Sequence, residues 1–293
     1  WLTRKRQFTV LSYNKVLPVL AVNLVSIGLG FAGNRALGAR LFSTLVGNIV
    51  NIAVLVSVLV PDLRLKREQQ YKKKELVGNY KNFLVYDIWG ALINNLSWMI
   101  VPILMNSYYG SFAAGQYSIG LRVIQIPASI IGASISQVFL KTASEKRYNS
   151  NLHEYTIVIA KKLFVFTVPF AITLLFLGKQ LFLFVFGSKW EVAGFYTQIL
   201  APWTIVWFVS SPISLIYTIL QKQNILLLLT VLNLVTRFLS LYIGSLYNNS
   251  VLGLILFSIT GIIIYTLVLL GSFMLAKRND RLNFINNKNS SNA

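Results

Sequence analysis

Asp87, Arg122 and Arg237 stand inside long apolar stretches of this sequence, where a charged side chain is costly. An arginine at the centre of a bilayer costs about 2.5 to 3.5 kcal/mol on insertion scales, so such residues face a water-filled cavity or a charged partner. A guanidinium group binds anionic oxygens, and a carboxylate takes up a proton or a cation. These residues are therefore candidates for a functional site.

Each of these residues shares one helical face with other polar or small residues, because steps of three and four return to the same side of a helix. The three stripes are Asp87, Gly90 or Ala91, Asn94 and Ser97; Ser118, Arg122, Gln125, Ser129, Ala133 and Ser136; and Thr230, Asn233, Arg237, Ser240 and Gly244. We predict these substrate-binding residues: Arg122, Gln125, Arg237, Asn233 and Asn94. Asp87 is a candidate for ion coupling. Two other interpretations stay open, since Arg122 can snorkel to the nearer membrane interface and Asp87 can be a structural partner of Lys81 or of an arginine.

The elements that carry these stripes are apolar runs of membrane-spanning length. Hydrophobic residues make up 55% of the chain and charged residues 12%, a balance that a soluble domain cannot cover with polar surface. Crossing the hydrocarbon core takes about 20 apolar residues, and inside lipid they must be helical because each backbone amide needs a partner. Eight runs meet this requirement: 16–33, 41–60, 83–105, 117–140, 163–186, 195–220, 225–246 and 251–276. We therefore predict an all-α membrane protein with about eight transmembrane helices.

The distribution of positive charge predicts the orientation of these helices. The chain has 27 Lys and Arg residues and 8 Asp and Glu residues. Such an excess of positive charge is typical of proteins that bind nucleic acid or lie in a membrane, and the high hydropathy favours a membrane. Most basic residues fall in alternate connections, and the opposite connections hold only Arg35, Arg40, Lys179 and Lys189. By the positive-inside rule both ends of this chain are cytoplasmic, in a multi-pass protein of the cytoplasmic membrane. Segment 61–82 is predicted to be a basic cytoplasmic linker, and the Asn- and Ser-rich tail 277–293 to be disordered.

The sequence lacks the residues that most enzymes need. It has no cysteine, and its one histidine, His153, stands apart from other metal ligands, so we predict no metal and no cofactor. It also lacks a glycine-rich phosphate-binding loop and a carboxylate pair beside a reactive Ser or His. The connections on the outer side are too short for a catalytic centre. We therefore expect a transporter rather than an enzyme, and the first residue, Trp1, suggests a chain that lacks its beginning.

Two stretches of the sequence carry a family resemblance. The first is Gly-Gln-Tyr-Ser-Ile-Gly-Leu-Arg-Val-Ile-Gln-Ile-Pro at 115–127, followed by a helix of small residues that ends in Ser-Gln-Val-Phe-Leu at 136–140. The second is Phe-Gly-Ser-Lys-Trp-Glu-Val-Ala at 186–193, followed by Gln-Ile-Leu-Ala-Pro at 198–202. They resemble the second lobe of polysaccharide repeat-unit flippases, the O-antigen and capsule exporters of the multidrug/oligosaccharidyl-lipid/polysaccharide superfamily.

These flippases have two lobes of membrane helices, and the resemblance assigns parts of this chain to both. Residues 1–60 would be the last two helices of the first lobe, 61–82 the linker, and 83–276 a six-helix second lobe. The resemblance implies that the protein flips an undecaprenyl-pyrophosphate-linked oligosaccharide for surface polysaccharides such as lipopolysaccharide O-antigen. It names membrane lipids, a polysaccharide polymerase and chain-length machinery as candidate partners. Arg122 matches the recurrent arginine of the family, whereas Arg237 comes from the stripe alone.

Two alternatives stay open from the sequence. A drug or cation antiporter of the same superfamily would carry acidic residues in its cavity, and here the embedded charges are mainly positive. A membrane-embedded polysaccharide polymerase would need a large outer loop or a cluster of His and carboxylate residues. We therefore favour an anionic, lipid-linked substrate.

Overall fold

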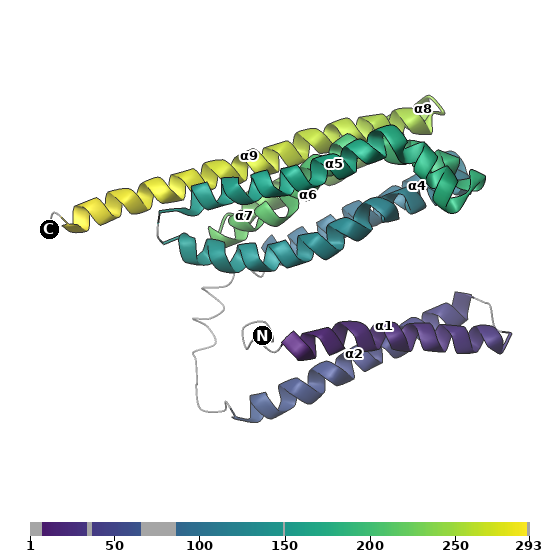
Figure 1. The fold of residues 1–293 in the computed structure, drawn as a ribbon, viewed down its shortest axis with the longest axis horizontal. Helices are drawn as coiled ribbons and strands as arrows, with labels where there is room; N and C mark the ends of the chain where they lie inside the picture. The colour runs from purple at the N-terminus through teal and green to yellow at the C-terminus, as the bar shows by residue number, and fades with distance from the viewer. Residues whose placement is uncertain (1–7, 34–36, 66–85, 149, 292–293) are drawn as a thin grey trace. The chain divides into compact units, whose positions relative to one another are not determined.

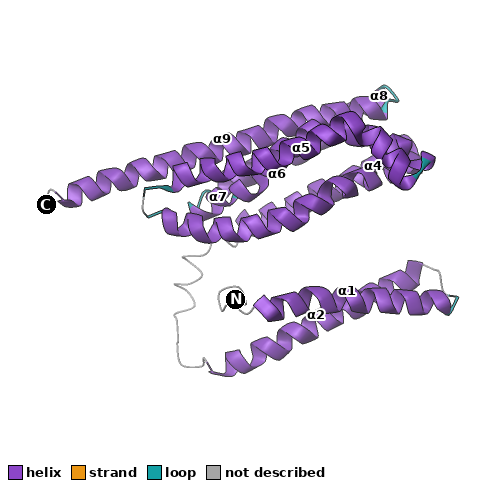
Figure 2. Cartoon of the chain, in the orientation of Figure 1, coloured by secondary structure: helices purple, strands orange, loops and turns teal. Residues whose placement is uncertain are grey.

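The computed structural model describes residues 8–33, 37–65, 86–148 and 150–291, and within these ranges every regular element is a helix (Figure 2). Five of the described helices are long and apolar enough to cross a membrane. The prediction of an all-α membrane protein is therefore confirmed. The chain divides into two compact units, Trp1–Leu76 and Val77–Ala293, and each is described by itself.

The first unit contains a pair of packed helices, α1 (Phe8–Phe31) and α2 (Leu37–Leu65) (Figure 1). Their apolar segments Val16–Phe31 and Leu41–Ser57 fall within the first two predicted spans. Helix α2 extends into the predicted linker as far as Leu65. The remainder of that linker, 66–82, lies outside the described residues, as do the basic residues Arg4, Lys5, Arg6 and Lys81.

The second unit is a bundle of long helices that pack along one another (Figure 1). In chain order its elements are α4 (Ile88–Lys146), α5 (Leu152–Phe186), the 3-10 turn η2 (Ser188–Trp190), α6 (Glu191–Ile213), α7 (Leu215–Ile219), α8 (Gln223–Leu246) and α9 (Ser250–Ser291). The predicted spans 163–186, 225–246 and 251–276 fall within α5, α8 and α9, and the span 195–220 covers most of α6 and all of α7.

Gly110 divides α4 into two arms. Its backbone has φ 83° and ψ 169°, a conformation that is open to glycine and closed to residues with a side chain. The arms, 88–109 and 111–146, line the same cavity, so the chain folds back at this glycine. The predicted spans 83–105 and 117–140 correspond to these two arms. The loop expected between them is reduced to a single non-helical residue.

Aromatic packing holds α6 against α4 and α9 in the core of the second unit. Trp203 of α6 is fully buried and stacks on Trp207, with 5.3 Å between ring centroids. Its other neighbours include Trp98 of α4 and Phe257 of α9, at 5.8 and 5.4 Å. A Cβ atom on Gly261 would lie 2.5 Å from the Trp203 ring, so glycine lets α9 approach this indole closely. Trp98 and Trp207 of this cluster also line the cavity described below.

The carboxyl-terminal part of α9 is helical to Ser291, so the prediction of disorder from residue 277 is wrong for 277–291. Tertiary hydrogen bonds explain the difference. The Asp280 carboxylate accepts the backbone N–H groups of Leu152 (3.2 Å) and His153 (2.8 Å) at the start of α5. Asn279 donates to the backbone carbonyl of Arg147 (2.8 Å), and so does Asn283. The polar composition that suggested disorder therefore provides helix-capping groups.

Replacement of Asp280 with alanine is expected to destabilise the protein by about 0.5 to 2 kcal/mol, because the first amides of α5 lose their cap and Asn151 provides none. Thermal unfolding of the purified protein in detergent measures this change. Asp280→Asn retains an acceptor oxygen and should keep most of the stability, and Arg281→Ala, at the exposed neighbouring position, is the control. A melting temperature of Asp280→Ala equal to that of Arg281→Ala would show that the cap contributes nothing.

Candidate functional site

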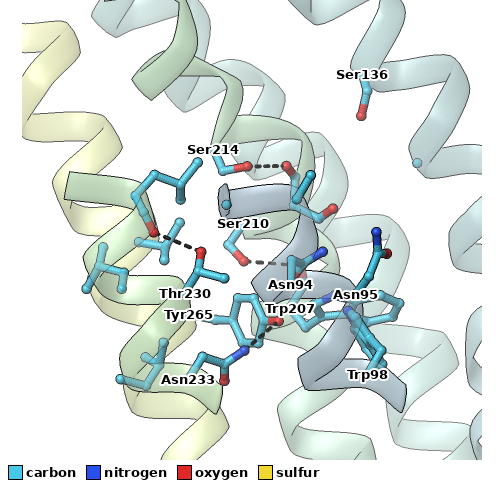
Figure 3. A pocket seen from close by; sticks show the side chains of 18 of the residues that line it. Asn94, Asn95, Trp98, Ser136, Trp207, Ser210, Ser214, Thr230, Asn233 and Tyr265 are labelled. Carbon is cyan, nitrogen blue, oxygen red and sulfur yellow. Dashed lines mark hydrogen bonds between the residues drawn. The ribbon is translucent and has the colours of Figure 1, made fainter. Parts of the chain in front are cut away.

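The second unit contains an open cavity of about 910 Å³, which residues from the two arms of α4 and from helices α6, α8 and α9 line. Amide and hydroxyl side chains dominate its polar lining, and Figure 3 shows several of them turned toward the same space. The polar lining residues are Asp87, Asn94, Asn95, Arg122, Gln125, Ser129, Ser136, Ser210, Ser211, Ser214, Gln223, Thr230 and Asn233. Such a surface offers many hydrogen-bond donors and acceptors and only two formal charges.

The structure brings together five of the six residues that the sequence singled out. Asn94 from the first arm of α4, Arg122 and Gln125 from the second arm, and Asn233 from α8 all line the cavity. Asp87, which precedes the first arm, lines it as well. Parts of the three polar stripes that the sequence predicted therefore face one space.

Arg122 is the cation of this cavity. Its side chain is exposed, and within the described part of the chain the structure shows no hydrogen bond or ion pair to it. Asp87 is half-buried and likewise shows no ion pair to a described residue, while Lys81, its proposed structural partner, lies outside the described ranges. Both charged groups are therefore available to a ligand as far as the described residues show.

Arg237 does not line the cavity, so its prediction as a direct contact to the substrate needs correction. It is 1% exposed and donates from Nη1 to the backbone carbonyl (2.9 Å) and the hydroxyl (3.0 Å) of Ser97. Its guanidinium carbon lies 4.4 Å from the ring centroid of Trp98 and 5.1 Å from that of Phe257. Helical spacing identified the polar face of α8. Thr230 and Asn233 on that face line the cavity, whereas Arg237 is buried in the protein core.

Several cavity residues escaped the sequence argument because they are aromatic. Trp98, Trp207 and Tyr265 line the cavity, and the two indoles lie edge to face with 5.2 Å between centroids (Figure 3). In a membrane protein an aromatic residue inside a span is consistent with core or lipid contact, so its type gives no signal of a site. Gly132 and Ser210 were missed too, since small residues are also common in helix packing.

Comparison with known proteins assigns the chain to a family. The sequence profile of the family described as polysaccharide biosynthesis protein matches residues 1–194. This chain belongs to that family. The match covers both arms of α4 and confirms the resemblance to polysaccharide proteins that the sequence motifs carried.

Part of the chain is also similar to a protein of teichuronic acid biosynthesis. The teichuronic acid biosynthesis protein TuaB of Bacillus subtilis (strain 168) is 26% identical to this chain over 116 residues. That alignment covers 39% of this chain and 24% of TuaB, so the chain spans only part of the length of this relative. No solved structure matches the chain significantly.

The lining of the cavity combines two kinds of surface. Amide and hydroxyl side chains can replace water around the polar groups of a ligand, and the rings of Trp98 and Trp207 add apolar surface beside them. The described lining has no histidine and only one carboxylate, Asp87. In the described residues no group of three or more His, Asp or Glu side chains could hold a metal ion. The arrangement is suited to binding a polar ligand.

Proposed function

We propose that this protein moves a lipid-linked oligosaccharide repeat unit across the cytoplasmic membrane during surface polysaccharide assembly, with undecaprenyl pyrophosphate as the lipid carrier. The observation that carries the proposal is a cavity within a bundle of membrane-length helices, lined by amides and hydroxyls and containing the exposed cation Arg122. Membership of a polysaccharide biosynthesis family supports a sugar-containing substrate.

Each part of the substrate has a suitable surface in the cavity. The Arg122 guanidinium would bind the pyrophosphate, because its planar donors match phosphate oxygens in pairs. Asn94, Gln125 and Asn233 would bind sugar hydroxyl groups by hydrogen bonds. The polyprenyl chain would stay in lipid, beside the apolar outer surfaces of the helices.

Transport in this proposal proceeds by alternating access, in which two groups of helices rock about a substrate site in the membrane. Asp87 is a candidate for coupling the movement to a proton or cation, because it is the only acidic residue in the described cavity lining. The paucity of titratable groups in that lining favours transport over catalysis. The polymerase and chain-length machinery would receive the translocated unit.

The charge distribution supports an orientation for this transporter. One end of the second unit carries many basic residues near its connections, among them Lys146, Arg147, Lys222, Lys277 and Arg278. The other end, around η2, carries Lys179 and Lys189, and Lys179 pairs with Glu191 at 2.7 Å. By the positive-inside rule this first end, which includes the carboxyl-terminal part of α9, would face the cytoplasm. For the amino-terminal end, the same orientation is proposed from the basic residues of the sequence alone.

Complementation tests the proposed function. The full-length gene is expressed in a strain that lacks its polysaccharide flippase, and surface polymer and lipid-linked repeat units are quantified together. We expect restored polymer and no accumulation of repeat units on the cytoplasmic side. Absence of polymer despite normal protein in the membrane would overturn the proposed substrate.

A further inference from the structure

The hydroxyl group of Tyr265, in the wall of the cavity, receives two hydrogen bonds from buried donors. Asn233 Nδ2 donates to it over 3.3 Å and Arg237 Nη2 over 3.4 Å, and Figure 3 shows the first of these contacts beside the cavity. The donors are 4% and 1% exposed. Asn233 is a nearly buried residue of the cavity lining, whereas Arg237 lies outside that lining. Tyr265 itself is half-buried and lines the cavity.

A phenol hydroxyl has one proton to donate and lone pairs that accept. Because the two N–H donors occupy the acceptor side of the Tyr265 oxygen, its own proton must point in another direction. In the described part of the chain no acceptor takes that proton. Tyr265 lines the cavity, so its hydroxyl group can donate a hydrogen bond to a ligand there.

We infer that Tyr265 donates a hydrogen bond to an anionic oxygen of the cavity ligand, and that Arg237 is a positioning residue that, together with the amide N–H group of Asn233, orients and polarises this hydroxyl. The inference deepens the proposed function and rests on it. The chemistry recognised is a negatively charged oxygen, which the carrier pyrophosphate or the carboxylate of an acidic sugar can supply.

The charge of Arg237 selects an anionic partner. Within the described residues no carboxylate pairs with this guanidinium, and its Nε has no hydrogen-bond partner. Among the described residues its positive charge is therefore uncompensated, and it contacts the hydroxyl of the cavity residue Tyr265 in surroundings of low polarity, where charge acts strongly. A donor nitrogen with a positive charge withdraws electron density from the phenol oxygen, which strengthens the hydrogen bond that the O–H group donates onward. Arg122 adds a second positive charge in the same cavity.

The guanidinium of Arg237 is held rigidly enough to orient Tyr265. Two hydrogen bonds tie its Nη1 to Ser97 of α4, and the rings of Trp98, Phe257 and Trp203 lie within 5.9 Å of its carbon atom. These contacts fix the donor before any ligand binds, so the Tyr265 hydroxyl is preorganised. Arg237 would thus act through Tyr265 without touching the ligand.

The test measures binding to the purified full-length protein in detergent with two probes, farnesyl pyrophosphate and a glucuronate-containing disaccharide, and with farnesol as the uncharged reference. The variants are Tyr265→Phe, Arg237→Met, Arg237→Lys and the double variant Tyr265→Phe/Arg237→Met. Tyr109→Phe is the matched control, because the Tyr109 hydroxyl donates to the Leu241 carbonyl (2.7 Å) and does not line the cavity. Arg237→Met keeps an apolar side chain among the rings, and Arg237→Lys keeps the charge as a point donor.

We expect Tyr265→Phe to bind the recognised probe about tenfold more weakly than wild type or Tyr109→Phe, as befits a hydrogen bond to a charged group. Arg237→Met should weaken probe binding when Tyr265 is present. In the double variant it should lower the affinity little beyond the effect of Tyr265→Phe alone. The probe that loses affinity identifies the source, pyrophosphate or sugar carboxylate. Equal affinity of wild type and Tyr265→Phe for both probes would overturn the inference alone, as would full additivity of the two substitutions. Failure of wild type to bind either probe better than farnesol would overturn the proposed function, and the inference with it.

Discussion

Replacement of Arg122 with alanine is expected to remove most surface polymer from cells that depend on this protein, while the protein remains in the membrane at its normal level. Arg122 lines the cavity, and its side chain makes no hydrogen bond or ion pair with the described residues. Replacement of Arg122 should therefore weaken ligand binding rather than the fold. A hydrogen bond to a charged group contributes about 1.5 to 3 kcal/mol, so the affinity for an anionic group should fall about tenfold to a hundredfold. Lipid-linked repeat units should accumulate on the cytoplasmic side.

Two further variants separate the chemistry of Arg122 from its charge. Arg122→Lys should restore export in part if a point charge is sufficient, and poorly if the paired donors of guanidinium are needed. Lys179→Ala is the control, because it removes one exposed positive charge outside the cavity, from a surface ion pair with Glu191 that contributes little to stability. Wild-type polymer levels in Arg122→Ala cells would remove this residue from the substrate path.

Much of the fold could be predicted because lipid imposes simple demands. The length of apolar runs located the helices of the second unit, and the need for internal hydrogen bonds decided their type. The ends of elements were predicted less well. Residues 106–116 were expected as a connection, but only Gly110 there has a non-helical backbone. The tail beyond 277 is helical because Asn279, Asp280 and Asn283 find partners on segments distant in sequence, which local composition cannot reveal.

The candidate site could be predicted as far as helical periodicity reaches. Steps of three and four placed Asn94, Arg122 and Gln125 on faces that meet in the cavity. Periodicity could not distinguish Asn233, which reaches the cavity, from Arg237 four residues later, which is covered by the side chains of Trp98 and Tyr265. That difference depends on which helix packs against each turn, and it emerges only in three dimensions.

Filling the cavity provides the second large effect. Substitution of tryptophan for Gly132 is expected to abolish export nearly completely, because Gly132 lines the cavity and a Cβ placed on it meets no atom within 4 Å. The indole would therefore extend into the space that the substrate needs. The fold should tolerate the change, since glycine within a helix is less favourable than residues with a side chain by several tenths of a kcal/mol or more. Surface polymer, membrane protein level and melting temperature measure these effects separately.

A series at this position tests whether volume is the cause. Gly132→Ala should export almost normally, Gly132→Leu at an intermediate level, and Gly132→Trp least, because the occupied volume rises in that order. Gly115→Trp is the matched control, since Gly115 lies in the same arm of α4, has open space around its Cβ position and does not line the cavity. Normal export by Gly132→Trp would mean that the substrate does not pass through this cavity. If Gly115→Trp reduced export as much as Gly132→Trp, the cause would be a bulky side chain on the helix surface. The cavity is supported as the route only if export falls in Gly132→Trp and stays normal in Gly115→Trp.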